Sequence, residues 1–157
     1  MDPQEIPRNV RLEDIMRPPV HVTPDTPARE ALKILVDNTM PSVPVVDTEG
    51  YLVGFVSDGH LLASALPKYM ADLEDLSFVR EGTDTWVHYL AESANRPISE
   101  VMSREVSSVE SGKSELVVAH KMVHEGTSSV MVTKDGKLIG IVNRLDLYAA
   151  VVGIDVD

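Results

Sequence analysis

The sequence predicts an α+β (mixed α/β) fold in which one β-α-β-β-α unit occurs twice, with a helical insert between the two copies. Two observations carry this prediction. The 157-residue chain aligns with itself at an offset of about 86 residues, and each aligned stretch contains a helical stripe followed by two short apolar runs. Each copy covers about 50 residues, which is too few to bury a large hydrophobic core alone. The two copies are therefore expected to pack together.

The self-alignment begins at the head of each copy, where Asp14-Ile15-Met16 lies opposite Glu100-Val101-Met102. Beyond the heads, the apolar positions keep their spacing apart from a one-residue insertion that is later reversed. The further aligned residues are Val20, Val22, Ser42, Val43 and Val45 with Val106, Val109, Ser129, Val130 and Val132, then Gly50, Leu52, Gly54, Val56 and Leu61 with Gly136, Leu138, Gly140, Val142 and Leu147. The chain is therefore an internal duplication.

Each copy is predicted to begin with a short strand, at 20–22 and 106–109, followed by a helix. In copy one Thr26 suits the N-cap of that helix and Pro27 its first position. The helices are indicated by apolar residues at i, i+3, i+4 and i+7 or equivalent spacing. These residues are Ala28, Ala31, Leu32 and Leu35 in copy one, and Val118, Ala119, Met122 and Val123 in copy two.

A hairpin and a second helix complete each copy. The hairpin strands are predicted at 43–46 and 52–56 in copy one, and at 130–132 and 138–142 in copy two. Their turns are Asp47-Thr48-Glu49-Gly50 and Lys134-Asp135-Gly136, and Asp-Gly between apolar runs is typical of a tight hairpin. The last helix is expected to begin near Asp58 in copy one and near Arg144 in copy two.

The segment between the copies has no partner in the self-alignment. It contains two helical stripes separated by the breaker-like residues 80–84, so two helices are predicted. The stripes are Leu66, Tyr69, Met70, Leu73 and Leu76, and then Val87, Leu90, Ala91 and Ala94. The predicted division is copy one at 10–66, the helical insert at 67–96 and copy two at 97–153.

Composition and charge exclude several functional classes. The chain has no cysteine, which removes disulfides, thiolate metal sites and cysteine nucleophiles and makes the cytoplasm the expected location. No apolar run approaches the roughly 20 residues of a membrane span, and the N-terminus lacks signal-peptide features, so no membrane is expected. The formal net charge is −11 without a cluster of Lys and Arg, so no nucleic-acid partner is expected.

The segments GFVSDGHLL at 54–62 and GIVNRLDLY at 140–148 resemble the signature of CBS domains, a family named after cystathionine β-synthase. The same resemblance extends to IMR at 15–17, VMS at 101–103, MPSVPVVD at 40–47 and, without the proline, TSSVMVTK at 127–134. It implies a non-catalytic tandem module whose two repeats pack with pseudo-two-fold symmetry. Modules of this family hold adenosine-containing ligands such as AMP, ADP, ATP, NAD or S-adenosylmethionine in clefts between the repeats, and they commonly form flat homodimers.

The residues that follow the last strand of copy two have the chemistry to hold a nucleotide. Asn143 and Asp146 stand where that strand ends and the last helix begins. A carboxylate can accept hydrogen bonds from both hydroxyls of a ribose, backbone N–H groups of a first helical turn suit phosphate oxygens, and Arg144 adds a cation. Asn and Asp also cap helices at such positions, so helix capping stays open as the other interpretation.

Copy one departs from the family pattern at the equivalent position. Ser57 is a normal occupant, but His60 stands where the resemblance implies the ribose-binding aspartate. An imidazole lacks a carboxylate's pair of acceptors, and Asp58 places a like charge near any phosphate. The two clefts are therefore expected to be unequal: the Asp146 cleft binds the ligand, and the cleft of Ser57 and His60 is the weaker one.

By resemblance, further residues of both copies line the Asp146 cleft. They are Pro18, Thr23, Met40, Pro41 and Ser42 from copy one, and Thr127, Ser128 and Ile141 from copy two. Met40 and Ile141 can wall an apolar slot for adenine or can be ordinary core residues. Thr127 and Ser128 stand where the family often has Arg or His, which favours a monophosphate or a weakly charged ligand.

Two functions remain open. The first is a regulatory sensor that binds an adenosine nucleotide, with Mg²⁺ accompanying a polyphosphate, and acts on an unknown protein partner in trans. The alternative is a ligand-free dimerisation or protein-interaction module of the same fold. An enzyme is not expected, because the sequence contains no GxSxG, HExxH, Walker or GxGxxG motif. No metal site is expected either, because His120 and His124 have helical spacing but no third ligand.

Overall fold

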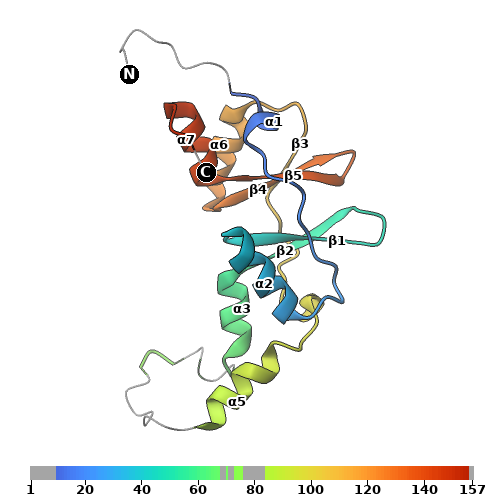
Figure 1. Cartoon of the computed structure of the whole chain (residues 1–157), viewed down its shortest axis with the longest axis vertical. Coiled ribbons are helices and arrows are strands. Elements are labelled where there is room, and N and C mark those ends of the chain that lie inside the picture. The colour runs from blue at the N-terminus through green and yellow to red at the C-terminus, as the bar shows by residue number, and fades with distance from the viewer. Residues whose placement is uncertain (1–9, 68–69, 71–72, 76–83, 156–157) are drawn as a thin grey trace. The chain divides into compact units, whose positions relative to one another are not determined.

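The computed structural model describes residues 10–67, 70, 73–75 and 84–155 (Figure 1). The chain folds into two compact units, and each unit is built from segments that are not consecutive in the sequence. Unit 1 comprises Met1–Val20, Thr48–Leu52 and Glu105–Asp157, and unit 2 comprises His21–Asp47 and Val53–Arg104. Each unit therefore combines the sheet and helices of one copy with the head of the other copy.

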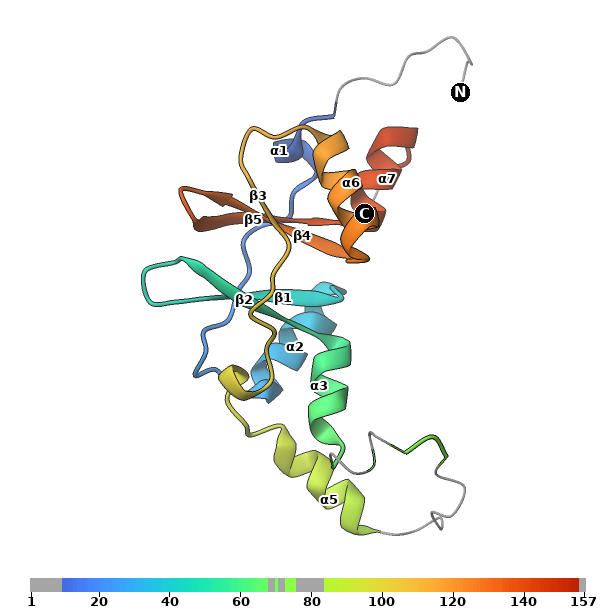
Figure 2. The ribbon, with the colours of Figure 1, turned by 180° about the vertical axis from the view of Figure 1, so that it is seen from behind.

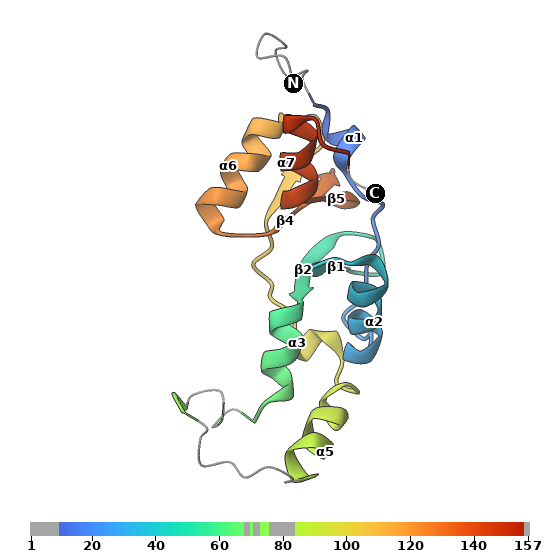
Figure 3. The ribbon, with the colours of Figure 1, turned by 60° about the vertical axis from the view of Figure 1, so that its left-hand side comes forward.

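Unit 1 contains a three-stranded sheet in the order β3-β4-β5. The strands are β3 (Ser108–Glu110), β4 (Ser129–Lys134) and β5 (Lys137–Asn143), with β3 parallel and β5 antiparallel to β4. Helices α6 (Glu115–Glu125) and α7 (Arg144–Val152) lie side by side on one face of this sheet (Figures 1 and 3). The predicted hairpin and both predicted helices of copy two are therefore confirmed.

The turn between β4 and β5 is tight and consists of Asp135 and Gly136. Asp135 has φ 53° and Gly136 has φ 82°, the two successive positive angles that a tight turn matched to the strand twist requires. Glu110 at the end of β3 stabilises the turn, because its carboxylate accepts hydrogen bonds from the backbone N–H groups of Asp135 (3.1 Å) and Gly136 (3.2 Å). The Asp-Gly signal in the sequence thus fixes the register of β4 and β5.

The head of copy one completes the core of unit 1. Helix α1 (Leu12–Ile15) contacts α7, and the Leu12 side chain is only 3% exposed. The core around it consists of Val109, Val118, Met122, Val130, Val132, Val142 and Leu147. After α1, Arg17 pairs with Ile141 of β5 through both backbone hydrogen bonds, at 2.7 and 3.1 Å. Gly140 permits this approach, because a side chain there would overlap Met16.

Unit 2 contains the equivalent elements of copy one. Strands β1 (Ser42–Val46) and β2 (Leu52–Ser57) pair with each other, and helices α2 (Ala28–Asn38) and α3 (Asp58–Ala65) lie on one side of them (Figure 2). The tip of this hairpin belongs to unit 1, where Leu52 N donates to the Gly136 carbonyl (3.1 Å). The predicted mixed α/β fold class is confirmed in both copies.

Two details of copy one differ from the prediction. The expected strand at 20–22 is reduced to a single parallel bridge between Val22 and Val45, the counterpart of the Val109–Val132 pair in unit 1. Helix α2 has Pro27 as its N-cap rather than Thr26. The Thr26 hydroxyl instead accepts a hydrogen bond from Thr23 N (3.0 Å), which closes the preceding turn and delays the helix by one residue.

The head of copy two packs in unit 2 just as the head of copy one packs in unit 1. The 3₁₀ helix η1 (Ile98–Glu100) buries Ile98 completely. Beyond it, Ser103 forms both backbone hydrogen bonds with Phe55 of β2, each 2.9 Å long. Phe55 and Ile141 are equivalent in the self-alignment, and so are Ser103 and Arg17. The exchange of heads therefore obeys the symmetry of the duplication.

The insert is described only in part. Its second predicted helix is confirmed as α5 (Asp84–Ser93), which contacts α3. The first predicted helix has its stripe at 66–76, and residues 68–69, 71–72 and 76 of that stretch lie outside the described residues. At the end of α5, Arg96 donates hydrogen bonds to the Tyr89 hydroxyl (3.2 Å) and the Ser64 carbonyl (3.4 Å), and so ties the insert to α3. Within the described ranges, no helix is long and apolar enough to cross a membrane.

Candidate functional site

Asp146 lies in the first turn of α7, and its side chain is buried. Burying a carboxylate costs free energy unless the charge is paired. Asn143 is the N-cap residue of α7, but its side chain makes no capping hydrogen bond. Instead its Oδ1 atom accepts a hydrogen bond from the Ser129 hydroxyl at 2.8 Å, which fixes the side chain against β4. Capping of α7 by Asn143, the alternative weighed above, is therefore wrong.

The cation beside Asp146 is Arg17, from the head of copy one. Arg17 Nε lies 2.7 Å from Asp146 Oδ2, and Arg17 Nη2 lies 3.2 Å from Oδ1, so the guanidinium donates a hydrogen bond to each carboxylate oxygen. The two side chains are 32% and 11% exposed, respectively. The hydrogen bond to Asp146 raises the pKa of Arg17 above its ordinary value. This two-pronged geometry is the strongest form of a hydrogen-bonded ion pair.

Sequence reasoning missed Arg17 as a site residue, because it lies 129 residues from Asp146 in the chain. The self-alignment places it just after the matched heads, but a repeat alone does not say which copy a head packs against. Arg144, expected to be the local cation, is exposed and lines a groove between α6 and α7. The exchange of heads is therefore what brings a guanidinium to the buried carboxylate.

The equivalent place in unit 2 is occupied by Ser103 and His60. His60 takes part in a capping box: its backbone N–H donates to Ser57 Oγ (3.0 Å), and its Nδ1 accepts from Ser57 N (3.1 Å). Such reciprocal bonds satisfy two of the donors that every helix leaves open at its start. One of the two imidazole nitrogens, Nδ1, is thus engaged in holding α3. That the cleft of Ser57 and His60 is the weaker one stays a prediction.

The other predicted site residues of copy two lie in unit 1 with Asp146. Ser128 accepts a hydrogen bond from Arg144 N through its carbonyl (2.9 Å), and the Thr127 hydroxyl donates to the Ser129 carbonyl (2.9 Å). Ile141 is fully buried in β5, as a core residue would be. From copy one, Pro18 also belongs to unit 1; it is exposed and directly follows Arg17.

The remaining predicted residues belong to unit 2. Met40 is buried, and the Pro41 carbonyl accepts a hydrogen bond from Asp58 N (3.1 Å) at the start of α3. The Thr23 hydroxyl donates to Asp25 Oδ1 (2.5 Å), and Ser57 Oγ caps α3. Ser42 is buried, and its hydroxyl has no hydrogen-bond partner among the described residues.

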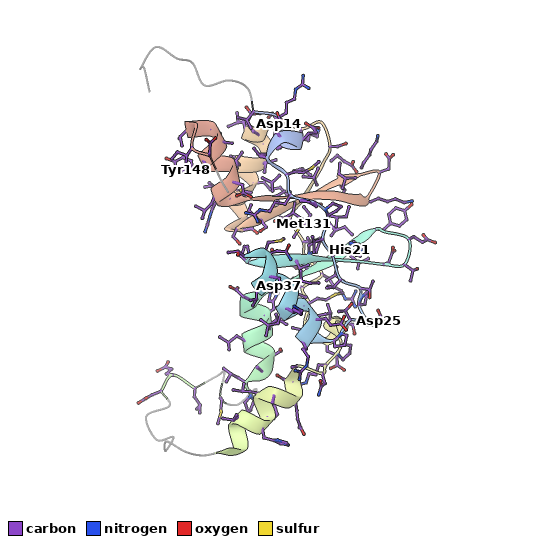
Figure 4. All side chains as sticks on the ribbon, viewed as in Figure 1. Asp14, His21, Asp25, Asp37, Met131 and Tyr148 are labelled. Carbon is purple, nitrogen blue, oxygen red and sulfur yellow. The ribbon has the colours of Figure 1, made fainter. Side chains whose placement is uncertain are left out.

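An apolar face forms the outer surface of α6 and α7. A groove of about 710 Å³ runs between these helices and is lined by Leu116, Val123, Leu145, Tyr148 and Val151 among others. Val123 is 85% exposed and Tyr148 is 68% exposed, and Figure 4 shows Tyr148 pointing outward from α7. Their equivalents in copy one, Val36 and Leu62, are likewise exposed on α2 and α3. The duplication thus keeps the same helix face apolar in both copies.

Comparison with known proteins decides the family. The family model described as "CBS domain" matches two stretches, residues 12–66 and 98–153. The chain belongs to the CBS-domain family. Both matches coincide with the copies found in the sequence, so the protein is a tandem CBS pair, as the resemblance implied.

This CBS pair is similar to known proteins in sequence and in fold. The CBS domain-containing protein CBSX1, chloroplastic, of Arabidopsis thaliana is 32% identical over 141 residues, which cover 85% of this chain and 59% of that protein. The chain thus spans less than two thirds of the length of that relative. A CBS domain of a membrane protein from Sphaerobacter thermophilus superposes with a TM-score of 0.71 at 27% identity, covering 92% of this chain and 89% of that one.

A third relative was solved with a ligand. The crystal structure of CBSX2 in complex with AMP has a TM-score of 0.66 and 24% identity, covering 91% of this chain and 96% of that one.

In this CBS pair the rings of His120 and His124, the two histidines with helical spacing, stack with their centroids 5.7 Å apart. Among the described residues, no group of three or more His, Asp or Glu side chains is arranged to hold a metal ion.

Proposed function

We propose that this CBS pair is a regulatory module that binds an adenosine nucleotide with one phosphate, and that Asp146 holds the ribose. The observation that carries the proposal is a buried carboxylate in the first turn of α7, in a position where the CBS resemblance implies a ribose ligand. The AMP complex of a protein with the same fold supports the choice of ligand.

The chemistry of this end of α7 suits both halves of such a ligand. The two carboxylate oxygens can accept hydrogen bonds from the two ribose hydroxyls. The phosphate would lie against the N-terminus of α7, which the Asn143 side chain leaves uncapped because it is bonded to Ser129. A monophosphate is preferred, since Thr127 and Ser128 supply no further positive charge beside it. Participation of Met40, Pro41, Ser42 and Thr23 remains a prediction.

Titration with AMP tests this proposal. AMP at about 1,000 times its Kd should add about 4 kcal/mol to the free energy of unfolding, a rise in melting temperature on the order of 10 °C. Asp146→Ala should weaken AMP binding about 100-fold, because two hydrogen bonds to a charged acceptor are lost. His60→Ala, the equivalent change in copy one, should keep most of the affinity. Calorimetric titration measures both variants.

The outcome also decides between the two functions left open by the sequence. A protein that shows no melting shift with AMP, ADP, ATP, NAD or S-adenosylmethionine, with or without Mg²⁺, would be a ligand-free interaction module. Equal losses from Asp146→Ala and His60→Ala would contradict the unequal clefts.

The apolar helix face supports a second part of the proposal, a homodimer. A two-fold interface requires the same surface on both partners, and exposed large apolar side chains on adjacent helices mark such a surface. The equivalent pairs Val36 and Val123, and Leu62 and Tyr148, give each copy of the duplication one such face. A second copy of this chain is therefore the proposed occupant of the groove between α6 and α7.

Charge introduced on this face should dissociate the dimer. Val123→Glu places a carboxylate in the proposed interface, where its desolvation costs several kcal/mol, while the exposed position leaves the fold intact. Sedimentation velocity at micromolar concentration should then show a monomer. Leu73→Glu changes an exposed leucine of the insert in the same way and should leave the dimer intact. A wild-type protein that sediments as a monomer would refute this part of the proposal.

A further inference from the structure

We propose that charges at the starts of four helices decide which surfaces meet in the homodimer: the α6–α7 face of one copy binds the α6–α7 face of the other, and not its α2–α3 face. This inference rests on the homodimer part of the proposed function and adds the pairing of the faces. The duplication offers both arrangements, because Val36 and Leu62 are exposed on one face and Val123 and Tyr148 on the other. Apolar residues alone do not choose between them.

The groove between α6 and α7 carries an anion at one end and a cation at the other. Glu115 is the first residue of α6, Arg144 is the first residue of α7, and both line the groove. Arg144 N donates a hydrogen bond to the Ser128 carbonyl (2.9 Å), just beyond the end of α6, so α7 starts where α6 ends. The 11 residues of α6 therefore place the two charges about 15 Å apart along the groove.

A two-fold axis gives both charges a partner. Within the described ranges, neither Glu115 nor Arg144 takes part in an ion pair. The Glu115 side chain is half-buried and the Arg144 side chain is exposed. A two-fold axis midway between the two residues exchanges them, so Glu115 of each copy faces Arg144 of the other. The α6–α7 face is therefore complementary in charge to itself.

The equivalent face of copy one carries its charges in the reverse order. Arg29 in the first turn of α2 is the equivalent of Leu116, which lines the groove of copy two. Asp58 is the first residue of α3 and the equivalent of Arg144. Its backbone N–H donates to the Pro41 carbonyl (3.1 Å), so α3 starts where α2 ends. Both charged side chains are exposed, and the cation now stands on the first helix and the anion on the second.

The reversed order decides which faces attract each other. Two α2–α3 faces bring Arg29 of each copy opposite Asp58 of the other, so this face is also complementary to itself. An α6–α7 face against an α2–α3 face brings Glu115 opposite Asp58 and Arg144 opposite Arg29. Like charges then meet at both ends of the interface, which disfavours this mixed pairing. Charge thus supplies the selectivity that the apolar residues lack.

Charge reversal tests this pairing by sedimentation equilibrium of the full chain without nucleotide. Glu115→Arg and Arg144→Glu each turn two attractive contacts of the dimer into repulsive ones, so each should raise the dimer dissociation constant about tenfold or more. The double variant restores the complementarity and should lie within about threefold of wild type. In the mixed pairing, either single change would meet an opposite charge and would lower the dissociation constant instead.

Two further points complete the experiment. Lys134→Glu makes the same change of charge at an exposed residue at the end of β4 and should leave the dissociation constant unchanged. Arg144→Glu carries the test if Glu115→Arg fails to fold by circular dichroism, because an anion is favoured at the N-terminus of α7. Single variants that dimerise as well as wild type, or better, would overturn this inference alone. A wild-type protein that sediments as a monomer would overturn the proposed homodimer with it.

Discussion

Gly54→Ala is expected to lower the free energy of unfolding by about 3 kcal/mol, although it adds only one methyl group. A Cβ atom at this position of β2 would overlap the Ser103 carbonyl oxygen and lie 3.4 Å from its carbonyl carbon. The obstacle is backbone, which cannot turn aside as a flexible side chain would.

The cost is large because the obstructing carbonyl belongs to a pair of hydrogen bonds. Phe55 N donates to the Ser103 carbonyl and Ser103 N donates to the Phe55 carbonyl, each at 2.9 Å. Moving the head of copy two away from β2 would weaken both bonds and loosen the packing of the buried Ile98. Overpacking and weakened hydrogen bonds therefore act in the same direction.

Urea denaturation followed by circular dichroism measures the effect, and Gly59→Ala is the matched control. Gly59 lies in α3, where an added Cβ would meet nothing closer than Ser57 Oγ at 3.6 Å. Alanine favours a helix by up to about 1 kcal/mol over glycine, so this variant should be neutral or slightly stabilised. Equal stability of the two variants would show that the head of copy two does not approach β2 this closely.

Leu12→Ala is expected to destabilise the protein by about 3 kcal/mol, the usual cost of emptying a buried leucine site. Leu12 comes from copy one but is 3% exposed in the core of unit 1, against residues such as Val109, Val142 and Leu147. Its side chain therefore packs residues from the two ends of the chain together in a single core. Truncating it leaves a cavity among strands and helices that are more than 90 residues away.

The same denaturation experiment tests this expectation, with Ile154→Ala as the control. Ile154 follows α7 in the same unit and is 63% exposed, so its truncation should cost less than about 0.5 kcal/mol. If Leu12→Ala cost no more than Ile154→Ala, the head of copy one would not be part of that core.

The local pattern of the sequence was sufficient to predict the elements that repeat. Both hairpins and both last helices begin within a residue or two of the predicted positions, because apolar periodicity and the Asp-Gly turn are encoded within short windows. The strand at 20–22 was overestimated for the opposite reason. A few valines can satisfy the pattern, whereas strand pairing depends on the neighbouring strand, and only Val22 is paired there, with Val45.

The site was harder to predict than the fold, because its chemistry depends on a contact across the chain. Asp146 could be singled out from its position after β5, but nothing near it in the sequence identifies Arg17 as its partner. Asn143 illustrates the same limit at shorter range. Its N-cap position was correctly recognised, yet the Ser129 hydroxyl on the neighbouring strand competes successfully for its side chain.

The exchange of heads also sets an order for folding during synthesis. All residues of unit 2, which are His21–Asp47 and Val53–Arg104, are synthesised before β3, the first strand of the unit 1 sheet. Leu12 and Arg17 emerge first and find their partners last, across a separation of 129 residues in the case of Arg17. Closing so long a loop is slow, and the apolar head stays exposed meanwhile. A chain truncated after residue 104 would therefore contain every residue of unit 2 but would leave the apolar N-terminal segment uncovered and prone to aggregation.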